Sequence, residues 1–141
     1  MQSVIVANPK TNPVQVADVL APGSNAVRYS AVLLNTASDD TVVPSVPAGK
    51  RLVVTYVTVN AISADGVNGP GNTVCYLDLN TSSSHDRLGG LPASSIGVTA
   101  VAGEQMFLPL ESGEGLGVFC QGSTGIAMND HVTVAGYYVP A

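Results

Sequence analysis

The chain of 141 residues contains few charged side chains, and those it has do not gather into a long run of one sign. Asp, Glu, Lys and Arg together make up 11% of the sequence, against roughly 25% in an average soluble domain. The five basic residues never occur more than two together, as at Lys50 and Arg51. Because nucleic-acid binding needs a basic stripe to neutralise phosphates, we expect no nucleic-acid partner.

Long hydrophobic runs are also missing. No apolar stretch approaches the roughly 20 residues of a membrane-spanning helix, and the start, MQSVIVANPKTNP, lacks the basic segment and apolar core of a signal peptide. We therefore expect a soluble protein with no membrane partner. With so little charge, its surface must be neutral and polar or partly hidden in an assembly, and we expect a homo-oligomer.

Cysteine is scarce and tryptophan is absent. Cys75 and Cys120 each alternate with apolar residues in a strand-like segment, which favours two small buried core residues. A disulfide between them stays open, because the sequence does not give the distance between the two residues. A chain of this length can form a core without metals or disulfides, so we expect a single folded domain.

β-branched and aromatic residues dominate the segment from Val46 to Ile62, VPAGKRLVVTYVTVNAI, which predicts a central strand after a Pro-Ala-Gly turn. Similar segments, separated by Gly, Pro, Asn and Ser, continue to the C-terminus, and none predicts a helix. This spacing is typical of an all-β sandwich or barrel. The predicted strands are Ala26–Asn35, Thr41–Val46, Arg51–Ile62, Thr73–Asn80, Ile96–Val101, Gln105–Leu110, Gly115–Gln121 and His131–Val139.

Strict alternation along the strand that begins at Arg51 places Leu52, Val54 and Tyr56 on one face and Val53 and Val57 on the other. Neither face is strongly polar. A strand with two apolar faces is covered on its outer side or belongs to a subunit interface.

Residues 1–25 differ from the remainder and predict an extended N-terminal arm, leaving residues 26–141 as the β-sandwich domain. Two Asn-Pro pairs prevent a regular helix there and favour extended geometry. Such an arm can lie along a sheet edge of its own or of a neighbouring subunit and cover unpaired backbone groups. The candidate partner-binding residues of the arm are Val4, Val6, Val14 and Val16.

One segment has the residue types of a hydrolase. His85, Asp86 and Arg87 follow three serines in NTSSSHDRLGGLPASS, a stretch from Asn80 to Ser95 that predicts a flexible, exposed linker. Adjacent residues in a flexible loop do not hold a nucleophile against an oriented base, and no G-x-S-x-G motif occurs. We therefore predict no catalytic residues and a protein that is not an enzyme.

Metal and cofactor sites have equally little support. Asp65, Asn68 and Asn72 could offer oxygen ligands for calcium, but their spacing matches no EF-hand, and Asp-Gly and Asn-Gly are strong turn formers. His85 and His131 are far apart, and no Cys/His pair has zinc-ligand spacing. The run G-E-G-L-G at 113–117 has no following helix to bind phosphate. We predict no metal ligands and no cofactor.

The segments V-P-A-G-K-R-L-V-V-T-Y-V-T-V at 46–59 and H-V-T-V-A-G-Y-Y-V at 131–139, with N-P-V-Q-V-A at 12–17, resemble small single-domain β-sandwich proteins of bacteriophages and prophages. The resemblance implies an all-β, jelly-roll-like sandwich with an extended N-terminal arm. It also implies a non-enzymatic capsid decoration or cement protein, usually a trimer, bound to the major capsid protein or another virion protein. Such a protein is soluble in the host cytoplasm before assembly and resides on the capsid surface afterwards.

A carbohydrate-binding or adhesion module is the alternative function. β-Sandwiches commonly hold sugars with exposed aromatic rings and polar loop side chains. Most of the seven aromatic residues here lie in the middle of predicted strands, which indicates core or interface positions instead.

Overall fold

The computed structural model describes residues 14–16, 25–34 and 41–141, which form β-strands and turns with no helix among them. This confirms the all-β class. Within the same residues no helix could serve as a membrane span. The strands are β1 (Val14–Val16), β2 (Ala26–Leu33), β3 (Thr41–Val43), β4 (Lys50–Ser63), β5 (Thr73–Asn80), β6 (His85–Ile96), β7 (Thr99–Leu110), β8 (Gly115–Gly122) and β9 (Met128–Pro140).

All strand pairs are antiparallel, and the strand order is β1-β2-β9-β4-β7-β6-β5-β8-β3. From β2 to β9 the chain folds back on itself like one long hairpin whose turn lies between β5 and β6. In this doubled chain, β5 pairs with β6, β4 with β7, β3 with β8 and β2 with β9. β9 also pairs with β4, and β8 also pairs with β5, so the doubled chain wraps round into a curved sheet.

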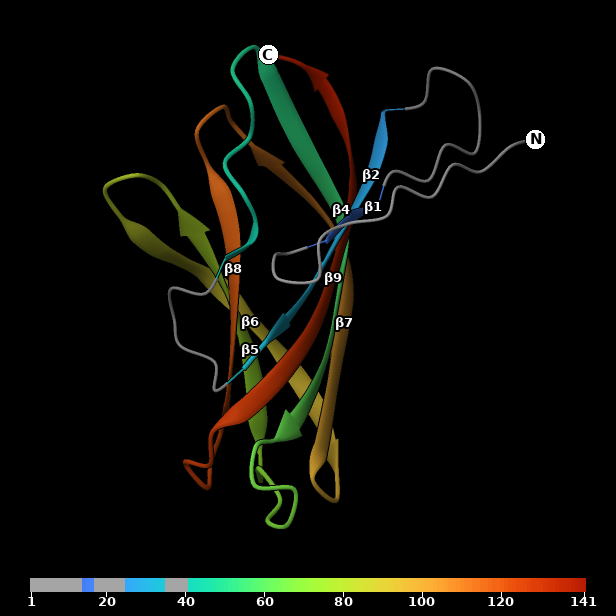
Figure 1. The fold of residues 1–141 in the computed structure, drawn as a ribbon, viewed down its shortest axis with the longest axis vertical. Coiled ribbons are helices and arrows are strands. Elements are labelled where there is room, and N and C mark those ends of the chain that lie inside the picture. Colours follow the sequence, from blue (N-terminus) through green and yellow to red (C-terminus); the bar gives the residue numbers. More distant parts are fainter. Residues whose placement is uncertain (1–13, 17–24, 35–40) are drawn as a thin grey trace, which may run out of the picture.

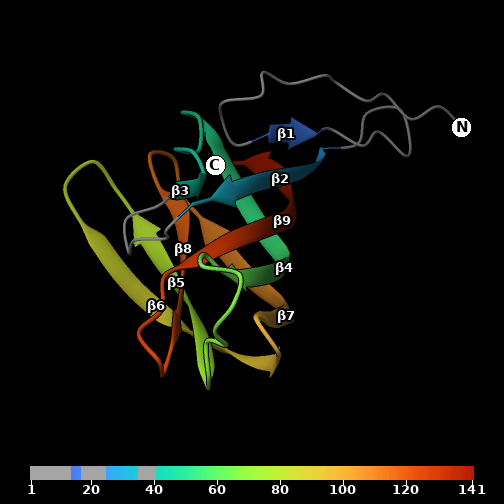
Figure 2. The same cartoon turned by 60° about the horizontal axis from the view of Figure 1, so that its bottom comes forward.

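The curved sheet has two halves that enclose the core. Figure 2 shows β2, β9, β4 and β7 on one side and β5, β6 and β8 on the other. β6 and β7 pair only near their shared turn, through Ser94–Ile96, and their other ends diverge (Figure 1). The core is built mostly of Val and Leu; its fully buried members include Leu52, Val54, Leu116 and Val132.

A β-bulge in β4 changes which side chains reach this core. Val54 pairs with Gly136 of β9, but Tyr56 pairs with the next β9 residue, Ala135, so Thr55 is an extra residue. Leu52 and Val54 are buried before the bulge and Val57 and Val59 after it, while Tyr56 is 40% exposed. The predicted alternation, which placed Tyr56 with Leu52 and Val54, is therefore wrong beyond residue 54.

The prediction of a flexible linker from Asn80 to Ser95 is also wrong. β5 continues through Asn80 and β6 begins at His85, so only a short turn separates them, and in it the Thr81 N–H donates to the Ser84 carbonyl. β6 is polar and glycine-rich because most of its length pairs only with β5 and its other edge faces solvent.

The next two predicted strands, from Ile96 and from Gln105, also have different bounds in the structure. Ile96 ends β6, and β7 is continuous from Thr99 to Leu110. The turn between them contains Gly97, whose φ of 60° is accessible to glycine at little cost. The sequence alone did not distinguish this hairpin turn from the start of a strand, because Ile and Val, which favour strands, occur on both sides of Gly97.

Cys75 and Cys120 are buried, as predicted, and they are joined by a disulfide. They are directly paired residues of β5 and β8, and both side chains face the core. The disulfide therefore links two neighbouring strands at the centre of one half of the sheet.

Candidate interaction surfaces

One described strand, β1, falls within the region predicted as an arm and lies at the edge of the sheet. Val14 pairs with Ser30 and Val16 with Arg28 of β2, in antiparallel register. Two of the four predicted partner-binding residues thus lie on a sheet edge, and the other two, Val4 and Val6, lie outside the described residues. Backbone pairing of this kind is one of the general ways in which an extended segment binds a sheet.

His85, Asp86 and Arg87 begin β6, and their side chains contact different partners. The His85 Nδ1 atom is 2.8 Å from Asn80 Oδ1, and the Ser84 hydroxyl donates to Asp86 Oδ2 at 3.1 Å. A hydrolytic triad would need the imidazole between the hydroxyl and the carboxylate. Here the hydroxyl bonds directly to the carboxylate, and the imidazole bonds to an amide.

Arg87 holds a buried carboxylate on the outer face of β5 and β6. Its Nε donates to Asp78 Oδ1 at 3.0 Å, and the Asp78 side chain is only 4% exposed. The guanidinium carbon lies 4.0 Å from the centroid of the Tyr76 ring, which stacks on Phe119 with 6.5 Å between centroids. Arg87 thus combines an ion pair with a cation–π contact, and both fix its orientation.

Replacing Arg87 with alanine is expected to lower the free energy of unfolding by about 2 kcal/mol, because it leaves the Asp78 carboxylate buried without its cation. The matched control is Arg51→Ala. Arg51 Nε bonds to Glu111 at 2.8 Å, but both side chains are at least 41% exposed, and exposed pairs contribute about 1 kcal/mol or less. Urea denaturation of both variants checks the difference. Equal losses of unfolding free energy in the two variants would show that the burial of Asp78 does not increase the contribution of its ion pair.

The turn considered for calcium is held by its own residues. Asp65 Oδ1 accepts hydrogen bonds from the Val67 and Asn68 amides, and Oδ2 accepts one from the Asn68 side chain. The Val67 amide, followed by the Asn68 contacts, lowers the pKa of the Asp65 carboxyl. Asn72 lies apart from this group, with its N–H donating to Ser123 Oγ. Among the described residues no group of three or more His, Cys, Asp and Glu side chains has metal-site geometry.

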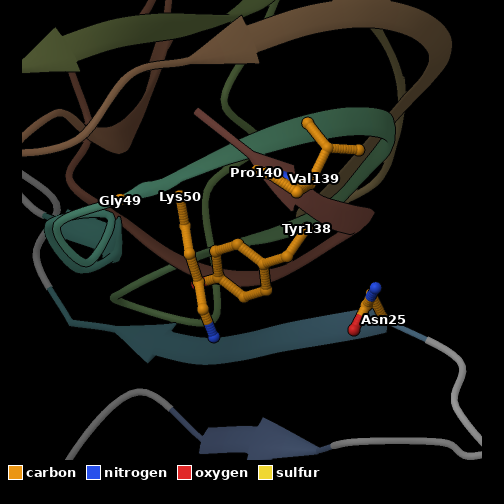
Figure 3. A pocket seen from close by; sticks show the side chains of 6 residues that line it. All are labelled: Asn25, Gly49, Lys50, Tyr138, Val139 and Pro140. Carbon is orange, nitrogen blue, oxygen red and sulfur yellow. The ribbon is translucent and has the colours of Figure 1, made fainter.

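A small pocket of about 190 Å³ lies where β2 begins, β4 begins and β9 ends. Figure 3 shows Lys50 and Tyr138 side by side above β2, with Asn25 at its start. The Lys50 ammonium is 5.3 Å from the Tyr138 ring centroid, and the Tyr138 hydroxyl hydrogen-bonds to that of Tyr29. Burial, followed by this hydrogen bond, raises the pKa of Tyr29. Lys50 of the same chain thus covers the Tyr138 ring, and the side chains around the pocket connect three strand ends.

A second depression, which we call the outer groove, crosses the solvent side of β4, β7 and β9. Its volume is about 510 Å³, within the range of small-molecule sites. The described residues that line it include no Asp, Glu, Lys or Arg. The lining residues include Tyr56, Asn60, Val101, Gly103, His131 and Thr133.

The aromatic residues, predicted to occupy core or interface positions, differ in exposure. Only Tyr29 is buried, whereas Tyr56, Tyr137 and Phe107 are exposed. Phe107, at 73% exposure, lies on β7 outside the outer groove. All seven aromatic residues lie in strands. The side of the sheet on which each ring lies depends on β-bulges and on which faces of the sheet are covered.

No family model and no curated protein matches this chain. Its function must therefore be inferred from these surfaces. Among the described residues, the surface features to consider are β1 on the edge of β2, the large apolar side chains exposed on the sheet, and the outer groove.

Proposed function

We propose that this chain is a non-enzymatic structural virion protein that decorates or cements a capsid. The observation that carries the proposal is β1, a segment of the arm that adds to the edge of β2 by backbone pairing. The same pairing can be made to the edge of a neighbouring subunit, which would clamp two subunits without requiring a particular side-chain sequence. The proposed partners are other copies of the chain, as a trimer, and the major capsid protein or another virion protein.

The strand order supports a jelly-roll fold for this role. The doubled chain, with β2-β9-β4-β7 in one half and β6-β5-β8-β3 in the other, matches the eight-strand, double-sheet arrangement of jelly rolls, which occur in capsid and lectin domains. Residues 26–141 form this unit in the proposal, and residues 1–25 form its extended arm.

Exposed apolar side chains support association with other subunits. Val32 and Leu34 are more than half exposed at the end of β2, the strand to which β1 pairs. Phe107 on β7 and Ile96 at the β6–β7 turn are more exposed still. In an assembly on the capsid surface, neighbouring subunits would cover these side chains and gain the free energy of burying them.

We expect the purified chain to be a trimer at micromolar concentration, measured by size-exclusion chromatography with light scattering. A monomeric mass at that concentration would contradict the oligomer. To test the virion role, antibodies raised against the chain are used on density-purified virus particles from its source. The chain should sediment with intact particles, and its absence from them would reject the capsid role.

Deleting residues 1–19 is expected to leave the remaining strands folded and to weaken attachment to the capsid at least tenfold, or about 1.4 kcal/mol. The reason is that β1 is removed while the strands that contain the core remain. Binding is measured by sedimentation with particles that lack the protein. Deletion of residues 1–13, which retains β1, separates its contribution from that of the preceding residues. If the 1–19 deletion bound as tightly as the full chain, the arm would have no clamping role.

A further inference from the structure

We propose that the outer groove is a binding site for a neutral carbohydrate chain, a function additional to capsid attachment and independent of it. Strand register places its residues in neighbouring rows. Asn60 of β4 is flanked by His131 of β9 and Val101 of β7, and in the next row Thr58 is flanked by Thr133 and Gly103. Polar and apolar groups thus converge from three strands.

Tyr56 supplies the apolar surface that a sugar ring needs. The β-bulge at Thr55 turns its side chain to the solvent side, where it remains 40% exposed. A Cβ atom added to Gly103 would lie 3.3 Å from the Tyr56 hydroxyl, so the tyrosine reaches across to β7 where the glycine has no side chain. A phenol held in this way combines an apolar ring with a polar tip, which suits the C–H and O–H groups of a saccharide.

The polar groups beside this ring are free to bind a ligand. Within the described part of the chain, no hydrogen bond engages the Asn60 amide, the His131 imidazole or the Tyr56 hydroxyl, although Asn60 and His131 are directly paired. An amide offers donors and an acceptor, and a neutral imidazole offers one of each. These are the complements of sugar hydroxyls, which both donate and accept.

The lack of charge narrows the ligand class further. Among the described residues that line the outer groove there is no carboxylate, ammonium or guanidinium group, so a phosphate, a carboxylate or an amine in it would lose water without gaining a counter-charge from them. A neutral polyhydroxyl chain avoids this desolvation cost.

The test starts with the full-length protein on a microarray of neutral glycans. Maltohexaose, cellohexaose and chitohexaose are then titrated in solution and followed by amide NMR shifts. We expect saturable binding of at least one glycan, with a Kd of about 1 mM or lower and shifts centred on Asn60, Gly103 and His131. Tyr56→Ala and Asn60→Ala should each weaken binding at least tenfold, with thermal melts used to confirm that both variants are folded.

Phe107→Ala is the matched control, because Phe107 is a more exposed aromatic residue on β7 that does not line the groove. It should bind the glycan as the wild type does. The proposal is overturned by the absence of binding to every neutral glycan, by unchanged binding in a folded Tyr56→Ala variant, or by shifts located elsewhere. It is also overturned if a second copy of the chain covers these residues in solution. The 1–19 deletion should retain glycan binding, so failure of the arm and failure of the groove are distinguishable.

Discussion

Replacing Gly136 with alanine is expected to lower the free energy of unfolding by about 3 kcal/mol, because β9 passes too close to the bulge of β4 to accept a side chain. A Cβ atom at position 136 would lie 2.2 Å from the Val53 carbonyl oxygen and 3.1 Å from the Val54 Cα atom. Both are backbone atoms, so relief requires movement of β4 itself. That strand pairs with β7 and β9 along nearly its whole length, and it has little freedom to move.

The matched control is Gly89→Ala in β6. A Cβ atom there has no other heavy atom within 4 Å, and Gly89 is not among the residues with positive φ. This variant should be neutral or slightly stabilising, since alanine restricts the unfolded chain more than glycine does. Chemical denaturation of the two variants and the wild type gives the comparison. If Gly136→Ala were as stable as Gly89→Ala, β4 and β9 would have to be farther apart at the bulge than described.

Removing the disulfide is expected to have the second large effect. The Cys75→Ala/Cys120→Ala variant should lose about 3 kcal/mol of unfolding free energy, because the bond closes a loop with a sequence separation of 45 residues in the unfolded chain. For a domain of this size, the loss corresponds to a fall in Tm on the order of 10 °C. Thermal melts of the oxidised protein and the double variant measure it.

Reduction of the wild type provides the control for the missing sulfur atoms. Protein purified and melted with a strong reductant should approach the Tm of the double variant, whereas the double variant itself should not respond to the reductant. The intact mass of the oxidised protein under non-reducing conditions should be lower than that of the reduced protein by two hydrogens. A Tm that is the same with and without reductant, together with two thiols that titrate once the protein is unfolded in denaturant without reductant, would show that the cysteines are not bonded.

Local sequence patterns were sufficient to predict most of the strands. Val46–Ile62 predicted the long central strand because β-branched residues favour extended backbone and Pro47 and Gly49 favour the preceding turn, and β4 indeed begins at Lys50. The burial of Cys75 and Cys120 followed from their alternation with apolar neighbours. These features depend on residues close together in the chain, so one sequence contains the relevant information.

The prediction for Asn80–Ser95 was wrong because composition reports exposure more directly than it reports backbone conformation. Ser, Gly and polar residues are abundant in loops, but they are also tolerated in an edge strand with one free side, which is the position of β6. Only the pairing of Cys75 with Leu91 and Tyr76 with Gly90 distinguishes the two, and that pairing joins segments across a turn.

The candidate groove could not be predicted from the pattern for a similar reason. An alternation of two residues places Tyr56 with Leu52 and Val54, and the extra residue at Thr55 reverses the side on which it lies. Whether a strand accommodates such a bulge depends on its partner, here on the absence of a side chain at Gly136. The all-β class, the turns and the buried cysteines are thus properties of short segments. The strand order, the disulfide and the convergence of Tyr56, Asn60 and His131 arise from contacts between distant segments, whose register no single segment specifies.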